Sequence, residues 1–342
     1  MNFIVSWNRG LQAVALGTVI LLSACQSNAV PPQAGTGSQP NFAPAQLMSK
    51  TAPVQEATPL PTNFGLARSP GSFSPSAGKA YLYIADQSND RIDIFPLHGN
   101  NQPQVGTITA GIDFPYGLWF DRKAQELYVA NQGNNTVTVY AHGSTQVKRT
   151  YTQGLNRPLY VIVDRQGEVY VGNANTGTVV EYLAGSTNIY QVLQTAGSEA
   201  DGMALDKQEN LYVAYRSGFQ GSIEKFAAGS TQGTVIGMSL NQPQGVVVVP
   251  RGNVLATETG GTNRIDEYAP GSPNAKLELP TSGAGTPTEL AIDCNEAILY
   301  VSAFDTGIVS GVDYPLPGQS LFGKDQVSPV IQGTTVDNNQ NL

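Results

Sequence analysis

Cysteine, histidine and positive charge are all scarce in this chain of 342 residues. It has two cysteines and two histidines, and its 18 lysines and arginines against 26 aspartates and glutamates give a formal net charge of −8. No basic run occurs along the chain. Because phosphate binding depends on clustered positive charge, the composition predicts that nucleic acid is not a partner.

A hydrophobic run long enough to cross a bilayer is also missing near the N-terminus. The apolar stretch from Leu11 to Leu22 is short for a membrane span, and it follows Arg9, which is typical of a signal peptide. Directly after it, Leu22-Ser23-Ala24-Cys25 resembles a bacterial lipobox. We therefore expect residues 1–24 to be a lipoprotein signal peptide and Cys25 to carry the lipid, palmitate included. An ordinary signal peptide or a short anchor with an incidental cysteine is the alternative.

The lipid on Cys25 is expected to attach the protein to a membrane of the bacterial cell envelope. Gln26 resembles the outer-membrane sorting pattern of enteric bacteria, so the outer membrane or cell surface is expected rather than the inner membrane. Residues 25–62 are rich in Pro, Ala, Ser and Thr with few bulky apolar side chains, which predicts a disordered linker. The other cysteine, Cys294, then has no intramolecular disulfide partner, so the fold must depend on its core.

Internal repetition dominates the rest of the sequence. One apolar phrase recurs six times, at Leu82–Ala85, Leu127–Ala130, Val169–Gly172, Leu211–Ala214, Val254–Thr257 and Leu299–Ser302. Successive copies are 42 to 45 residues apart. An aromatic residue closes the next strand of every unit, at Phe95, Tyr140, Tyr182, Phe226, Tyr268 and Tyr314. Each unit reads as two apolar strands, one alternating strand and one polar strand, which is typical of a propeller blade.

The repeats predict an all-β fold, a six-bladed β-propeller of four-stranded antiparallel blades over residues 63–336, with a disordered tail at 337–342. Closure of the first blade stays open at this point. Either Phe64–Phe73 supplies its inner strand, or Val330–Val336 completes the blade from the C-terminal end. Joined ends are expected in both cases, because an unpaired strand edge promotes aggregation.

The residues that repeat also carry a resemblance to known propellers. Leu127–Asn131, Gly133–Val137 and Pro115–Leu118 resemble the NHL-type six-bladed propellers, and more broadly the superfamily of the streptogramin lyases and the gluconolactonase or regucalcin group. The resemblance implies the fold. It does not assign an activity, because the repeated residues are those that build a blade.

Candidate site residues lie where the chain leaves the second strand or enters the inner strand of each blade, since those loops share one face of a propeller. Oxygen-bearing side chains occupy these positions at Asp86, Asn131, Asn173, Asp201, Glu258 and Glu289. Six such side chains without a matching set of cations repel each other, and a divalent cation such as Ca²⁺ relieves that repulsion. The gluconolactonase group implies the same kind of site. The alternative is that Asn131, Asn173 and Asp86 cap turns after the second strand and that no cofactor is bound.

Four further residues at this face are candidate ligand contacts: Tyr116, Tyr160, Tyr215 and Arg157. The tyrosines can stack on a sugar or peptide, or they can simply pack the funnel. Both histidines, His98 and His142, follow a third strand and are expected away from the channel, which disfavours a Ser-His-Asp centre.

Two functions are compatible with these observations. The favoured hypothesis is a non-catalytic, membrane-anchored scaffold, monomeric, that binds a protein, a glycan or a cell-wall partner. The alternative is a divalent-metal-dependent lactonase or related hydrolase with its site at the channel mouth.

Overall fold

The computed structural model describes residues 81–96, 103–236, 238–249, 251–281, 285–292, 298–303, 308–314, 326–329 and 334–337. The predicted signal peptide, Cys25, the linker, Phe64–Phe73, His98 and Cys294 lie outside these ranges. Within them, no helix is long and apolar enough to cross a membrane.

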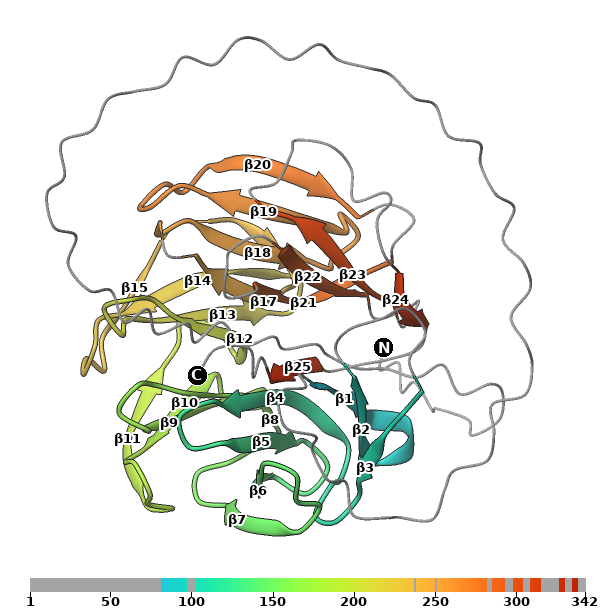
Figure 1. Ribbon diagram of the computed structural model, residues 1–342. Helices are drawn as coiled ribbons and strands as arrows, with labels where there is room; N and C mark the ends of the chain where they lie inside the picture. Colours follow the sequence, from blue (N-terminus) through green and yellow to red (C-terminus); the bar gives the residue numbers. More distant parts are fainter. Residues whose placement is uncertain are drawn as a thin grey trace, which may run out of the picture. The chain divides into compact units, whose positions relative to one another are not determined.

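The described strands form six antiparallel sheets, numbered here 1 to 6, which confirms an all-β propeller of small antiparallel blades (Figure 1). The inner strands of sheets 1 to 6 are β25 (Thr334–Asp337), β4 (Pro115–Asp121), β8 (Pro158–Val163), β12 (Glu199–Leu205), β17 (Pro243–Val248) and β21 (Pro287–Ile292). The second strands are β1 (Tyr81–Asp86), β5 (Glu126–Asn131), β9 (Val169–Asn173), β13 (Leu211–Ser217), β18 (Val254–Glu258) and β22 (Ile298–Ala303).

The third and outer strands complete the sheets. The third strands are β2 (Arg91–Pro96), β6 (Thr136–Ala141), β10 (Thr178–Tyr182), β14 (Gln220–Phe226), β19 (Arg264–Tyr268) and β23 (Ile308–Asp313). The outer strands are β3 (Gly106–Ile108), β7 (Val147–Tyr151), β11 (Ile189–Gln194), β15 (Gly233–Val235), β20 (Ala275–Pro280) and β24 (Gln326–Pro329). The additional strand β16 (Leu240–Asn241) pairs with β14, and a 3-10 turn η1 (Gln87–Asn89) follows β1.

Burial explains why the second strands are apolar and the outer strands are polar. Every residue of β5, β9 and β18 is buried, because a second strand is covered on both faces. The outer strand β7 is instead mostly exposed apart from Tyr151. The continuous apolar phrases of the sequence are therefore the buried second strands.

Sheet 1 is completed from the C-terminal end of the chain. Strand β25 pairs antiparallel with β1, with Tyr81 opposite Asp337 and Tyr83 opposite Thr335 (Figure 1). This selects the second of the two predicted ways of completing the first blade. Strand β25 ends at Asp337, one residue beyond the predicted end of the propeller at 336.

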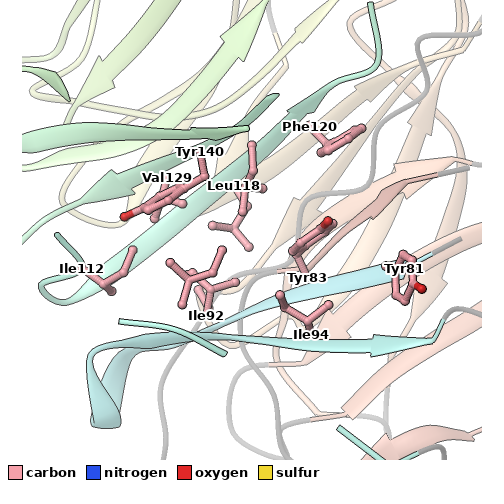
Figure 2. Close-up of a cluster of buried hydrophobic side chains, with 12 residues drawn as sticks. Tyr81, Tyr83, Ile92, Ile94, Ile112, Leu118, Phe120, Val129 and Tyr140 are labelled. Atoms are coloured by element: carbon pink, nitrogen blue, oxygen red, sulfur yellow. The ribbon is translucent and has the colours of Figure 1, made fainter. Parts of the chain in front are cut away.

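The core lies between neighbouring sheets. Figure 2 shows the cluster between sheets 1 and 2, in which Tyr83 of β1 stacks on Phe120 of β4 with ring centroids 5.9 Å apart. Ile92 and Leu118 of the same cluster are fully buried. Similar clusters lie between later sheets. Each sheet therefore depends on its neighbours to bury its apolar faces.

The inner strands approach each other closely near their starts. Contacts join β25 with β4, β4 with β8, β8 with β12, β12 with β17, and β17 with β21. Three of these strands have glycine at a bulge against the second strand: Gly117, Gly202 and Gly245. A Cβ on Gly117 would clash with the carbonyl oxygen of Leu159, and one on Gly202 with that of Gln244. Glycine is thus required where one inner strand packs on the next.

Candidate functional site

The candidate site lies at the end of the sheets where loops enter the inner strands and hairpins join second to third strands. In a four-stranded antiparallel sheet these connections share one end, and hydrogen bonds join them here. Gln132 N donates to Phe114 O over 3.1 Å, and Ala174 N donates to Arg157 O over 3.0 Å. We call this end the mouth face.

Two of the predicted ligand residues, Asn131 and Asn173, hold the loops that enter their own inner strands. Asn131 Oδ1 accepts a hydrogen bond from Asp113 N at 3.2 Å, and its Nδ2 donates to Thr138 Oγ1 at 2.9 Å. Asn173 Oδ1 accepts from Asn156 N at 2.9 Å. Both asparagines are fully buried. They serve as structural caps, as the alternative interpretation of the sequence expected.

Two predicted carboxylate ligands each combine a backbone amide with an arginine: Glu258 holds the loop into its own inner strand, whereas Asp86 caps the turn of its own hairpin. Asp86 Oδ1 accepts from the backbone of η1, and its Oδ2 lies 3.1 Å from Arg91 Nη2. Glu258 Oε1 accepts from Asn241 N at 3.0 Å, while its Oε2 lies 2.9 Å from Arg264 Nε. In both cases the arginine opens the third strand directly opposite the end of the second.

The remaining two predicted ligands, Asp201 and Glu289, are buried on inner strands. Asp201 Oδ2 lies 2.6 Å from Arg216 Nε, and Arg216 Nη2 lies 2.6 Å from Glu199 Oε2. Burial raises the pKa of Asp201 to about 6 despite the attraction of Arg216. Burial also raises the pKa of Glu289 well above its ordinary value, and in the described part of the chain its Oε1 has no hydrogen-bond partner.

For three of the four predicted carboxylates, Asp86, Asp201 and Glu258, the expectation that they lack a cation is wrong. Arg91, Arg216 and Arg264 supply the cations, and each is shared with at least one further carboxylate: Asp93, Glu199 and Asp266, respectively. Among the residues that the structure describes, no three His, Cys, Asp or Glu side chains gather as a metal site requires. Apart from Glu289, the predicted ligand residues use their oxygens to contact backbone amides or arginines.

The predicted aromatic contacts divide into packed and open side chains. Tyr160 is buried, and its ring meets that of Tyr116 edge to face with centroids 5.6 Å apart. Tyr116 and Tyr215 are half-buried at the mouth face. Away from this face, His142 follows β6 and packs edge to face on Phe120, with centroids 5.5 Å apart. Tyr160 thus packs the funnel, while Tyr116 and Tyr215 keep some exposed surface.

Arg157 has an exposed side chain and an unusual backbone conformation. Its φ is +56°, in the left-handed region, as are those of Phe114 at +48° and Gln242 at +46°. Each of the three directly precedes the proline that opens an inner strand. The prolines were visible in the sequence, but the left-handed conformation before them was not, because a residue before proline ordinarily prefers extended backbone.

A hairpin from the preceding sheet holds the amide of each left-handed residue. Phe114 N donates to Asp90 Oδ1 at 2.7 Å. Arg157 N donates to Asn135 Oδ1 at 2.6 Å, and Gln242 N donates to the backbone oxygen of Phe219 at 2.8 Å. The hairpins of sheets 1, 2 and 4 thus fix the loop of the next sheet.

Phe219 is a mouth-face residue that the sequence analysis missed. It lies at the tip of the β13–β14 hairpin beside Gly218, whose φ is +64°, and it is 69% exposed. Phe114 is also partly exposed at this face. The only sequence signal is an aromatic residue next to glycine in a polar hairpin, which is weak without a structure.

The fold and this face define the chain as a β-propeller, and comparisons with known proteins agree. Residues 45–163 match a family described as "Lactonase, 7-bladed beta-propeller". The chain is similar to a structure in "Crystal structure of Nidogen/Laminin Complex", with 18% identity, a TM-score of 0.63, and coverage of 75% of this chain and 98% of that one.

A second solved structure, hydrazine synthase from Kuenenia stuttgartiensis, is similar at 17% identity with a TM-score of 0.56, covering 71% of this chain and 77% of that one. At such identities the likenesses show the fold alone. No curated protein gives a match.

Proposed function

We propose that this protein is an envelope-anchored β-propeller that binds a protein, glycan or cell-wall partner without catalysing a reaction. The lipobox-like sequence before Cys25 and the linker at 25–62 support the anchor. The propeller then serves as a rigid body held away from the membrane surface by a flexible tether.

We further propose that the propeller has six blades. Support comes from the six sheets of the described residues and from the six copies of the apolar phrase. The family that matches residues 45–163 is described with seven blades, but that match spans only sheet 2 and parts of sheets 1 and 3. The completion of sheet 1 by β25 is the way such a ring is closed.

One observation carries the non-catalytic role: the polar side chains of the mouth face are engaged in holding its loops. Asn131, Asn173 and Glu258 accept loop amides, and Asp201 is paired with Arg216. Groups used in this way form a fixed surface rather than a reactive set. A preorganised surface favours binding because little order is lost on association.

The anchor and the binding role can be tested together with the full-length protein and its Cys25→Ala variant. We expect the wild type, but not the variant, to partition into the detergent phase and to incorporate a palmitate analogue. A photo-crosslinking residue at Tyr215 of the anchored wild type is expected to give one discrete adduct in intact cells. Crosslinks that match those of an unrelated anchored propeller would contradict the binding role.

Lactone hydrolysis is the second candidate, favoured by the family match over residues 45–163. The buried Glu289, whose Oε1 lacks a partner in the described residues, is the side chain most suited to proton transfer there. Hydrolysis of simple aldonolactones, with and without millimolar Ca²⁺, tests it. Melting curves in the same buffers report binding, because a cation held only by the folded state raises Tm. If the protein shows no turnover and no shift in Tm, this candidate is eliminated.

A further inference from the structure

Exposed apolar side chains gather on the outer edge of sheet 3. Leu183, Ile189, Tyr190 and Val192 are between 37% and 56% exposed, and they are four of the nine exposed large apolar side chains of the described residues. Ile189, Tyr190 and Val192 belong to β11, and Leu183 follows Tyr182, which lies opposite Ile189. We call these four residues the edge patch. Apolar surface that gathers in this way is characteristic of an interaction site.

Three side chains of the edge patch lie on one face of sheet 3. A Cβ built on Gly154 would lie 2.8 Å from Ile189 Cδ1 and 3.3 Å from Val180 Cγ2, so these two side chains share a face. Val192 lies opposite Val180 and therefore has the same face. Tyr190 comes two residues before Val192, on the same side of the strand. The edge patch is thus continuous along β11.

The backbone along this edge is open as well. Strand β11 is the outermost strand of sheet 3, and no strand of the described residues pairs with its free side (Figure 1). In an antiparallel sheet, alternate residues of such a strand direct their N–H and C=O groups away from the neighbouring strand. A further strand can therefore be added at this edge.

The other five outer strands have features that discourage such pairing. Lys148 and Arg149 lie on β7, and Lys276 and Glu278 lie on β20. Strands β3 and β15 have 3 residues each, and β24 ends at Pro329. Charge, short length and proline are the usual protection of an exposed edge. Strand β11 has 6 residues, no charge and no proline, so its edge is the one suited to pairing.

We propose that β11 is a dimerisation edge, at which β11 of a second copy of this chain pairs antiparallel across a two-fold axis through Gln191. In this register Tyr190 of each copy lies opposite Val192 of the other, so an aromatic and a β-branched side chain meet twice. Two copies with a net charge of −8 repel each other, and an uncharged edge adds nothing to that repulsion. The sequence analysis expected a monomer, and this dimer replaces that expectation as the proposal.

The dimer is expected to be weak in solution and stronger on a membrane. One pair of strands of 6 residues buries less surface than the roughly 1,600 Å² of a standard protein interface. The lipid anchor proposed above confines all copies to one surface, which raises their effective concentration. The dimer goes beyond the proposed binding role and uses a different surface from the mouth face.

Disulfide trapping of the full-length protein in lipid vesicles tests the register. Tyr190→Cys mixed with Val192→Cys should form a linked dimer under mild oxidation, because opposite Cβ atoms lie about 4.5–5.5 Å apart. Either variant alone should crosslink much more slowly, because its two cysteines are then diagonal neighbours about 7–8 Å apart. The wild type, which keeps Cys25 and Cys294, is the control for other disulfides.

A charge placed on the edge tests the pairing without cysteines. Val192→Lys should weaken self-association about tenfold or more, because it removes both cross-strand pairs and charges the shared edge. Energy transfer between fluorescent copies in the same vesicles measures this. Val192→Ile should associate as the wild type does. Val235→Lys, at an exposed apolar residue of the outer strand β15, is the matched control and should also leave association unchanged.

Several outcomes would overturn the proposal. They are equal crosslinking of the mixed and single cysteine variants, wild-type copies that stay apart at every protein density, and equal association of Val192→Lys and Val235→Lys. Crosslinking of Tyr190→Cys to a different envelope protein in cells would likewise overturn it and assign the edge to that protein. Melting curves of all variants check that they fold. None of these results bears on the adduct expected at Tyr215, so the binding role is tested separately.

Discussion

Sheets 3 and 5 place different chemistry at the same point, where the second strand ends at the mouth face. In sheet 3 the uncharged Asn173 accepts a loop amide and donates to Thr178 Oγ1 at 3.0 Å. In sheet 5 Glu258 accepts the equivalent amide and is paired with Arg264. Both arrangements fix the loop that enters the inner strand, in sheet 3 with neutral groups and in sheet 5 with charged ones.

The difference shows which part of the site is structural and which depends on charge. Thr178 is the first residue of β10, and Arg264 is the first residue of β19. The neutral Thr178 contacts the neutral Asn173, and the cationic Arg264 contacts the anionic Glu258. Glu258 is therefore an alternative to asparagine in a structural role. The charged version is more sensitive to losing its partner, since a buried charge without one is costly.

Removal of Arg264 is expected to have the largest effect. Its Nε lies 2.9 Å from both Glu258 Oε2 and Asp266 Oδ1, and these carboxylates are 1% and 0% exposed. Arg264→Met leaves both without a cation, so we expect a loss of about 4 kcal/mol in the free energy of unfolding, measured in urea. In sheet 3, Thr178→Val removes only a neutral partner and should cost about 1 kcal/mol. Equal losses would show that charge is irrelevant to the comparison.

Gly202→Ala tests the close packing of one inner strand, β12, on the next, β17. The new Cβ would clash with the carbonyl oxygen of Gln244 on the next inner strand, which cannot move aside. We expect a loss of about 3 kcal/mol in urea unfolding. Gly229, with a φ of +73° and nothing within 4 Å of a Cβ, is the control, and Gly229→Ala should cost about 1 kcal/mol. A smaller loss at Gly202 would mean that the strands can separate.

The period of the repeats was enough to predict the propeller and the mouth face. Apolar phrases 42 to 45 residues apart correspond to the buried second strands, and antiparallel order alone decides which loops share an end. The way sheet 1 is completed could not be chosen, because Thr334–Asp337 has only one apolar residue and resembles a loop. Pairing with β1, not its own pattern, makes it a strand.

The chemistry of the mouth face was harder to predict than its position. The sequence analysis counted carboxylates there without asking which residue lies opposite each one. Asp86 faces Arg91 across a tight hairpin and Glu258 faces Arg264, pairs that the hairpin spacing could have indicated. Arg216 pairs with Asp201 across two strands. The left-handed backbone at Arg157 depends on a hydrogen bond from another sheet, which no local pattern contains.

Replacing a neutral pair by a charged pair in sheet 2 tests whether the two arrangements are interchangeable. Asn131 is fully buried and lies opposite Thr136, so Asn131→Asp places a carboxylate there without a cation. We expect a loss of about 2 kcal/mol at pH 7. Adding Thr136→Arg to give the double variant should recover about half of it, as a double-mutant cycle would show. If the second substitution recovers nothing, the pairing seen in sheets 1 and 5 does not transfer.

The smallest expected effect is a dependence of stability on pH that comes from the charged arrangement in sheet 5. Burial raises the pKa of Asp266 from 3.8 to about 6, although Arg264 opposes the rise. The folded protein therefore holds this proton more tightly than the unfolded chain, and the stability it contributes below pH 4 is lost as the pH rises through about 6. We expect the share of Asp266 in the fall of Tm between pH 5 and pH 7.5 to be equivalent to about 1 kcal/mol.

Asp266→Asn should reduce that change in Tm, because one titrating group is gone, while Asp93 and Asp201, whose pKa burial also raises to about 6, remain. Glu278→Gln is the control, since Glu278 is 55% exposed and pairs with the same arginine. It should change the pH dependence only slightly, because the charge of Glu278 is the smallest of the contributions that raise the pKa of Asp266. Burial opposes ionisation of Glu126, but Lys148, Tyr128 and Arg149 lower its pKa below the ordinary value, so the stability it contributes is lost only at more acidic pH, outside this window. The difference between Asp266→Asn and the wild type is therefore the decisive measurement, and identical slopes would assign the pH dependence to residues outside sheet 5.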